Sequence, residues 1–350
     1  MPIHPITRFR RTVTGSRRPL TCGLLGGLAV TLLAVSGGAA QASPSPSPSL
    51  AGVTITFGDQ LKAYQTILAA TNALKGAPYT VNWANFIGGP PVIAAETSGS
   101  VDLGFMAETP TIFAEEAGDP VKVVSATLNA NPKVSPYAIV VPTGSPIKSL
   151  SQLKGKSIAV QEGTVEQYFL IQELEKGHVA YNAVHIQNLT ITNAATAVAN
   201  NQVQAAVLSQ PLTGIDQTQG KIRVIGTGVG TSQTIGYLTA SSSALANPQK
   251  AAAIADFIVR FDKAEAQLRK NPLLAAQTYV KTYGVPLTVA KEAVASEESV
   301  GSPITPAIES YQQAEANTFL KLGLLTTPIN VKKIFDLPFN KTVDKAAGIS

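Results

Sequence analysis

The chain has 350 residues, with 27 Lys and Arg against 22 Asp and Glu, which gives a formal net charge of +5. Five of the basic residues and none of the acidic ones lie in residues 1–42, so the remainder has 22 of each and is formally neutral. A neutral remainder removes the main electrostatic argument for a protein that binds nucleic acid or an anionic membrane. The single cysteine, Cys22, also lies in this first segment, so the remainder has no thiol, disulfide or Cys-ligated metal.

The first 42 residues have the three parts of a secretory signal. The basic residues come first and are Arg8, Arg10, Arg11, Arg17 and Arg18. An apolar run from Leu20 to Val35 follows, and Ala40-Gln-Ala42 then provides the small residues of a cleavage site. The apolar run is too short for a comfortable membrane span, so we expect cleavage after Ala42 and export of the rest. The paired arginines before the run also resemble the twin-arginine type of signal.

A low-complexity segment of alternating Ser and Pro follows the leader, at residues 43–50. Such a segment is extended and solvated, so we interpret it as a tether between the leader and the folded body. Folding is expected to begin near Val53. Roughly 300 residues then remain, which suits two ordinary α/β lobes and is long for one.

Two stretches of the chain share the element order strand, helix, strand, helix, strand. In the first, the apolar patterns predict strands at 53–57, 79–86 and 101–105 and helices at 65–74 and 92–97. In the second, they predict strands at 157–160, 184–191 and 203–208 and helices at 165–176 and 194–200. The repeat predicts an α/β fold with two lobes of one design, each with a parallel sheet whose ligands lie beyond the carboxyl ends of the strands.

Five loops follow strands of the two lobes, and each contains glycine or opens a helix. Because the carboxyl ends of parallel strands share one edge of a sheet, we expect these loops to face one cleft. The residues that we expect to bind a ligand there are Asp59, Gln60, Gly88, Gly89, Glu108, Thr109, Gly163, Thr164, Ser209 and Gln210.

Two of these loops are helix starts that favour an anion. Thr109 is placed to cap a helix whose first turn accepts Pro110, and Thr164 forms a capping-box pattern with Gln167. The unpaired backbone N–H groups and the dipole of a helix start attract negative charge. The loop at 88–91 also opens a helix, but its two prolines donate no N–H.

Motifs spread over nearly all of the expected exported chain carry a resemblance to a known family. They are Phe86-Ile-Gly-Gly-Pro90, Gly99-Ser-Val-Asp-Leu-Gly104, Glu108-Thr-Pro110 with Phe113-Ala114, Val141-Pro142, Ser145-Pro-Ile147, Leu153-Lys-Gly-Lys156, Ile158-Ala-Val160, Gly163-Thr164, Ile304-Thr-Pro306 and Leu322-Gly-Leu324. On these motifs the chain resembles the substrate-binding proteins of ABC importers for aliphatic sulfonates, taurine and nitrate. The resemblance implies the type II periplasmic-binding fold, in which two hinged lobes close on a small ligand and present it to a membrane permease.

The resemblance also places the lobe boundaries. The strand pattern at 137–141 is expected to leave the first lobe, and the pattern at 235–239 to return to it. We therefore expect a first lobe made of residues 51–141 and 233–350, with residues 142–232 as the inserted second lobe. The tail is predicted to form helices at 248–269, 273–283, 287–295 and 305–322, with their apolar stripe in the core of the first lobe.

The expected ligand loops depart from the sulfonate binders that the chain resembles. Those proteins usually carry Trp-Asp-Pro where this chain has Ser209-Gln-Pro211, so an apolar wall is missing. The loops contain carboxylates but only Lys62 as a cation, and no Arg that could hold an anion with its fork. An anionic head would therefore depend on helix starts and backbone N–H groups, while Asp59 or Glu108 could receive an amine. We expect a small organic anion or zwitterion as the ligand.

Two other classes of function stand beside an exported solute receptor. The fold also resembles the pyrimidine-forming proteins of thiamine biosynthesis, which are of a Cys-rich, His-using type; a thiamine-precursor binder or a related enzyme is therefore the alternative. The expected exported chain has no Cys, and its histidines, His178 and His185, match no catalytic or zinc-binding motif. A structural or adhesive module would leave the five loops without a common purpose. We therefore expect no catalytic residue, cofactor or metal, and a monomer that acts with an ABC permease and its ATPase.

Overall fold

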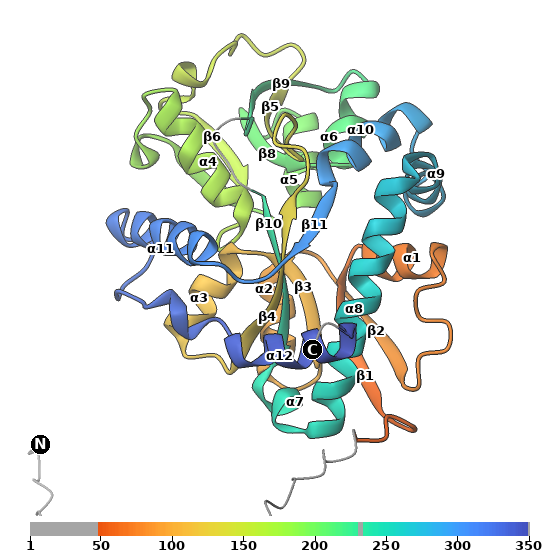
Figure 1. The fold of residues 1–350 in the computed structure, drawn as a ribbon. Helices are drawn as coiled ribbons and strands as arrows, with labels where there is room; N and C mark the ends of the chain where they lie inside the picture. The colour runs from red at the N-terminus through yellow and green to blue at the C-terminus, as the bar shows by residue number, and fades with distance from the viewer. Residues whose placement is uncertain (1–47, 230–233, 349–350) are drawn as a thin grey trace, which may run out of the picture. The chain divides into compact units, whose positions relative to one another are not determined.

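The computed structural model describes residues 48–229 and 234–348, and these residues belong to one compact unit. The expected leader and most of the expected tether lie outside the described residues. Within the described ranges, no helix combines the length and the apolar character that a membrane crossing requires. The described chain forms two mixed sheets with helices packed against them (Figure 1).

The first sheet has six strands in the order β11-β4-β10-β3-β1-β2. They are β1 (Thr54–Gln60), β2 (Thr80–Phe86), β3 (Leu103–Ala107), β4 (Val121–Asn129), β10 (Ile235–Ser241) and β11 (Ser299–Ser302). β1 pairs in parallel with β2 and β3, as the sequence pattern predicts, and Phe57 lies opposite Trp83 and Leu103. β10 runs antiparallel to β3 and β4, so the sheet is mixed.

The second sheet has five strands in the order β7-β6-β8-β5-β9. They are β5 (Tyr137–Pro142), β6 (Ser157–Val160), β7 (His185–Asn188), β8 (Ala205–Ser209) and β9 (Ile222–Thr227). β6 pairs in parallel with β7 and β8. β5 runs antiparallel between β8 and β9, with Ile139 opposite Val207 and Gly226.

The two sheets repeat one spatial order, because β2-β1-β3-β10-β4 in the first matches β7-β6-β8-β5-β9 in the second. In this shared order β10 and β5 occupy the same place, and each runs antiparallel to both of its neighbours. The first sheet has a further antiparallel strand, β11, at its edge beside β4. The expectation that the strand at 137–141 belongs to the first lobe is wrong for the sheets, because β5 is hydrogen-bonded to β8 and β9. The chain therefore leaves the first sheet between β4 and β5. The lobe boundaries themselves stay a prediction.

The helices follow the predicted order with small shifts at their ends. They are α1 (Ala63–Ala70), α2 (Gly89–Thr97), α3 (Thr109–Ala117), α4 (Val165–Lys176), α5 (Ile191–Ala199), α6 (Leu212–Thr218), α7 (Ser242–Ala246), α8 (Pro248–Lys270), α9 (Pro272–Tyr283), α10 (Leu287–Glu297), α11 (Pro306–Lys321) and α12 (Asn340–Ala347). Short 3₁₀ turns lie at Leu150–Leu153, Tyr181–Ala183, Val331–Lys333 and Leu337–Phe339. α4 begins and ends at the predicted residues, whereas the strand predicted at 184–191 ends at Asn188 because α5 begins at Ile191.

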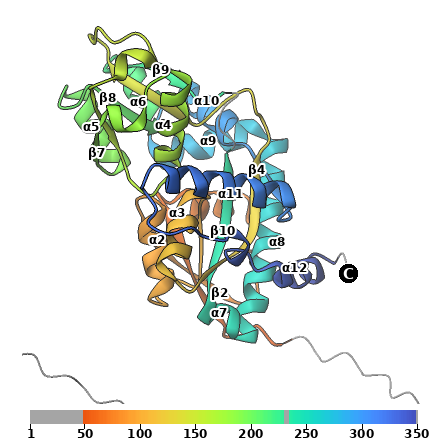
Figure 2. The ribbon, with the colours of Figure 1, turned by 90° about the vertical axis from the view of Figure 1, so that its left-hand side faces the viewer.

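The core is built on both faces of each sheet. On one face of the first sheet, Val124 and Phe57 pack with Phe257 of α8. On the other face, Val123 belongs to a cluster with α3 and α11, since neighbouring residues of a strand point to opposite faces. Tyr168 of α4 joins this cluster, and Figure 2 shows α11 running past α3 and α4. All six residues of β5 are buried, as is typical of a strand covered on both faces.

The tail helices do not all pack on the first sheet. α8 does, and it begins where the side chain of Asn247 accepts two backbone N–H groups and Pro248 fits the first turn. α10 packs instead against α6, which follows β8 of the second sheet, so that Val289 and Ile215 share one apolar cluster. The expectation that the whole tail packs on the first lobe is therefore wrong for α10, because the side chains of α6 complete its apolar face.

Candidate functional site

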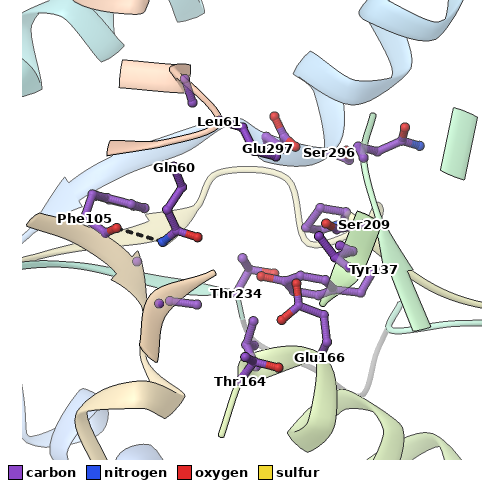
Figure 3. A pocket seen from close by; sticks show the side chains of 18 of the residues that line it. Gln60, Leu61, Phe105, Tyr137, Thr164, Glu166, Ser209, Thr234, Ser296 and Glu297 are labelled. Carbon is purple, nitrogen blue, oxygen red and sulfur yellow. Dashed lines mark hydrogen bonds between the residues drawn. The ribbon is translucent and has the colours of Figure 1, made fainter. Parts of the chain in front are cut away.

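A cavity of about 260 Å³ lies where the carboxyl ends of β1, β3 and β8 meet (Figure 3). Its walls come from loops of both sheets, from the starts of α2 and α4, and from α9 and α10. β4 contributes Asn129 and β5 contributes Tyr137. The cavity therefore lies at the strand edge where α/β proteins bind ligands.

Six of the ten expected site residues line this cavity: Gln60, Gly88, Gly89, Thr164, Ser209 and Gln210. The side chain of Gln60 is held in place because its Nε2 donates to the carbonyl oxygen of Phe105 at 2.9 Å. Gly88 has a φ of +84°, and a Cβ added there would lie 2.9 Å from Oε1 of Gln161. The positive φ therefore favours glycine at position 88, and the side-chain amide of Gln161, from the loop after β6, lies beside it. Contact of these six residues with a ligand stays a prediction.

Asp59 lies outside the lining of the cavity. It is fully buried, and its carboxylate accepts the backbone N–H of Tyr64 at 3.1 Å and that of Gln65 at 2.8 Å. Burial raises the pKa of Asp59, and these hydrogen bonds oppose the rise. Its carboxylate therefore organises the first turn of α1. Lys62, the cation of this loop, is exposed, has a φ of +62° and does not line the cavity.

Glu108 and Thr109 are also fully buried outside the lining. The hydroxyl of Thr109 donates to Oε1 of Glu315 in α11. The prediction that Thr109 caps α3 is therefore wrong, because its side chain is engaged with another helix and Glu108 occupies the cap position. Burial raises the pKa of Glu108 well above its usual range, with the charge of Glu315 adding to the effect, and it raises the pKa of Glu315 to about 8.

The start of α4 confirms the expected helix but alters its cap. Thr164 occupies the cap position, yet its hydroxyl donates to the carbonyl oxygen of Gln161 at 2.6 Å. Oε1 of Gln167 accepts the backbone N–H of Gly163 at 2.8 Å, one residue before the bond that a capping box makes. Gly163 has a φ of +71° and lies outside the lining, where an added Cβ would be 3.7 Å from Phe113 of α3.

The charged side chains of the cavity wall are acidic. Glu166, Glu297 and Glu298 line it, and its described lining residues include no Lys or Arg. Residues 230–233, which the structure does not describe, have the sequence Gly-Thr-Ser-Gln and so contain no cation. Figure 3 shows Glu166 at the α4 wall with its carboxylate toward Tyr137, and Glu297 at the α10 wall. Burial raises the pKa of Glu166 and raises that of Glu297 to about 8. The hydroxyl of Tyr279 donates to the two carboxylate oxygens of Glu297, at 3.2 and 3.1 Å.

The tail supplies lining residues that the sequence analysis missed. Tyr279 and Tyr283 of α9 and Glu297 of α10 line the cavity, so the expectation that the apolar tail stripe is core alone is wrong for these helices. The spacing of the two tyrosines places them on one helix face. That pattern fits a core stripe equally well, so it gave no separate signal for a site.

The two histidines lie apart from the cavity. His178 and His185 are both exposed and do not line it. Across the described ranges, no three His, Cys, Asp or Glu side chains are grouped so that they could hold a metal ion.

A family model described as NMT1/THI5 like matches residues 89–300. The chain belongs to this family. A relative of this NMT1/THI5-like chain in Escherichia coli (strain K12), named for binding aliphatic sulfonates, is 27% identical over 307 residues, which cover 86% of this chain and 92% of the relative. The resemblance stated from the motifs is thus confirmed.

Solved structures show the fold. The alkanesulfonate-binding protein SsuA from Xanthomonas axonopodis pv. citri, bound to MOPS, superposes with a TM-score of 0.75 at 23% identity, covering 81% of this chain and 98% of that one. The desulfurization enzyme DSZB superposes with a TM-score of 0.60 at 14% identity, covering 84% of this chain and 99% of that one. The NMT1/THI5-like chain therefore has the periplasmic-binding-protein fold, as predicted. Since a binding protein and an enzyme both share this fold, the site must decide between them.

Proposed function

We propose that this chain is an exported solute-binding protein of an ABC importer, which captures a small organic anion or zwitterion and delivers it to a permease and its ATPase. The observation that carries the proposal is the cavity, since loops at the carboxyl ends of strands from both sheets converge on it. The Escherichia coli relative named for aliphatic sulfonates and the Xanthomonas protein bound to MOPS support an organic sulfonate as the ligand class.

The binding residues in this proposal are the six expected ones that line the cavity, Gln60, Gly88, Gly89, Thr164, Ser209 and Gln210. The start of α4 presents backbone N–H groups and a positive dipole end, which supply attraction for an anionic head where the wall lacks a cation. The start of α2 adds its dipole and the N–H groups of Gly88 and Gly89 alone, because Pro90 and Pro91 donate none. Glu166 lies in the first turn of α4, so an anion there competes with its carboxylate. We infer that the head group binds with Glu166 protonated or displaced.

The ligand in this proposal is bound without chemical change. The described chain contains no Cys, and its histidines are exposed away from the cavity, so no Cys or His of the lining serves as a nucleophile or base. The alternative, a thiamine-precursor binder or a related enzyme of the same fold, gains no support from a particular residue of the wall. Its ligands belong in the same binding screen.

Capture in this proposal involves closure of two lobes, each built on one sheet. The chain passes from the first sheet to the second after β4 and is back in the first sheet at β10. The first of these connections, residues 130–136, is a hinge segment in this proposal. We propose that the protein acts as a monomer in which the ligand shifts an open-to-closed equilibrium. Small-angle scattering tests this step, because an unchanged radius of gyration at saturating ligand would exclude closure.

The experiment that tests the proposed function is a thermal-shift screen of the exported chain, which we expect to begin at Ser43. The panel contains alkanesulfonates, taurine, nitrate, sulfate esters and thiamine precursors, and calorimetric titration follows each hit. A ligand at 100 times its dissociation constant adds about 2.7 kcal/mol to the free energy of unfolding. Stabilisation by a sulfonate supports the proposal, and conversion of the bound compound or the absence of any stabilisation would refute it.

A further inference from the structure

A second cavity, of about 620 Å³, adjoins the first and lies among α1, α8, α9 and α10. The two cavities share seven lining residues, among them Tyr64, Tyr279, Tyr283 and Glu297. We call this shared wall the neck. Because one set of side chains borders both spaces, the two cavities meet along the neck.

The neck combines aromatic rings with a carboxylate. The ring centroids of Tyr279 and Tyr283 are 4.6 Å apart, and those of Tyr64 and Phe105 are 4.3 Å apart. Glu297 accepts the hydroxyl of Tyr279 and presents its remaining surface to the cavity. The faces of aromatic rings attract cations, and a carboxylate beside them adds a direct counter-charge. This combination favours a positively charged nitrogen.

The cationic side chains near the neck do not neutralise its carboxyl groups. Glu298 also belongs to the shared wall. Arg269 lines the second cavity, but it donates to the carbonyl oxygen of Ser299 and its charge acts on Asp262 and Glu265. Lys291, the other cation of that lining, is exposed at the surface of α10. Neither cation lines the first cavity.

The second cavity offers apolar surface beyond the neck. Leu268, Pro272, Leu273 and Val294 are among its lining residues. Apolar walls of this kind stabilise a hydrocarbon substituent by removing its surface from water. The two cavities thus place three environments next to one another: helix starts in the first cavity, a carboxylate with aromatic rings at the neck, and an apolar second cavity.

We propose that the ligand of this protein is an N-substituted zwitterion: its acidic head lies in the first cavity, its cationic nitrogen lies at the neck against Glu297, and an apolar group on that nitrogen fills the second cavity. The inference rests on the proposed function and narrows its ligand class. Alkanesulfonates without nitrogen would leave the carboxylate of the neck without a counter-charge, and so would bind less tightly.

Matched probes test the nitrogen directly with the unmodified protein. We would titrate N-cyclohexyl aminoalkanesulfonates with spacers of two to four carbons, each against the isostere in which CH₂ replaces NH₂⁺. Both members of a pair have the same head and nearly the same apolar area, so their affinity ratio reports on the charge. We expect the ammonium member of the best-fitting pair to bind at least tenfold more tightly at pH 8.5, where Glu297, whose pKa is raised to about 8, is mostly ionised.

Variants then assign the effect to the neck and the second cavity. Glu297→Gln should abolish the preference for the ammonium member, while Tyr279→Phe, which keeps the ring, should retain most of it. Leu273→Trp should weaken the cyclohexyl probes at least tenfold and leave taurine unchanged, because it fills the second cavity alone. Leu322→Trp is the matched control, since Leu322 is an exposed leucine that lines neither cavity.

The outcomes separate this inference from the proposed function. Equal affinity within every isosteric pair, or a preference that survives Glu297→Gln in a protein that melts normally, would overturn the inference while leaving a sulfonate-binding protein in place. Failure of all sulfonates to bind would overturn the proposed function and the inference with it. Tight binding of the ammonium members that depends on Glu297 supports both.

Discussion

The free energy of unfolding of this protein should fall as pH rises, and replacing Glu96 by Gln should make that fall smaller. Glu96 lies in α2, whose start borders the cavity, and its side chain is 1% exposed. Its Oε1 accepts the hydroxyl of Thr239 at 2.9 Å, and its Oε2 has no hydrogen-bond partner in the described part of the chain. Burial raises the pKa of Glu96 from the usual 4.5 to about 8, and the hydrogen bond from Thr239 opposes the rise.

The sign of the effect follows from proton binding. Between pH 4.5 and pH 8 the folded protein keeps the proton of Glu96, whereas the unfolded chain has released it. The folded state therefore binds more protons, and the free energy of unfolding falls as pH rises through this window. Each pKa unit corresponds to about 1.4 kcal/mol, so Glu96 removes about 3 kcal/mol of stability between pH 5 and pH 8.

Urea denaturation at pH 5, 6, 7 and 8 measures this contribution in both proteins. We expect the stability difference between Glu96→Gln and the unmodified protein to grow by about 3 kcal/mol in favour of the variant from pH 5 to pH 8. Glu175→Gln, at an exposed carboxyl on α4, gives the background for the same chemical change at the surface. A difference that stays constant with pH, or that grows toward acid, would refute the assignment of a buried, protonated carboxyl.

Three further predictions concern the candidate site. Thr164→Val should weaken ligand binding about three- to tenfold in calorimetric titration. Thr109→Val should leave affinity unchanged and lower stability by about 1–3 kcal/mol, because it removes the hydroxyl that donates to the buried carboxyl group of Glu315. Asp59→Ala should lower stability by about 1–2 kcal/mol through loss of the α1 cap, and an unchanged melting temperature would contradict that role. Gly163 and Gly155 have φ of +71° and +72°, so Gly163→Ala and Gly155→Ala should each lower stability by about 1–2 kcal/mol. Only Gly163→Ala should reduce affinity, because it shifts the start of α4. If the two glycine variants bound the ligand with equal affinity, the start of α4 would not be part of the binding site.

The expected site residues form two groups, because some polar side chains point into the cavity and others point into the protein interior. Gln60 and Asp59 are neighbours at the end of β1, yet Gln60 lines the cavity and Asp59 turns inward to α1. The same holds for Thr164, which lines the cavity, and Thr109, which donates to Glu315. A polar residue before a helix can bind a ligand, cap its helix or reach a distant carboxylate, and local sequence does not distinguish these roles.

What the sequence by itself determined about this protein is local and periodic. The apolar periods place α4 at the observed residues and the parallel strands β1, β3, β6 and β8 near theirs, because side-chain spacing reports which face of an element is buried. Only the tertiary structure decided that β5 joins the second sheet, since strand pairing depends on hydrogen-bond partners far along the chain. It alone also brought Tyr279 and Glu297 to the cavity, because a helical stripe shows that one face is covered but not which elements cover it.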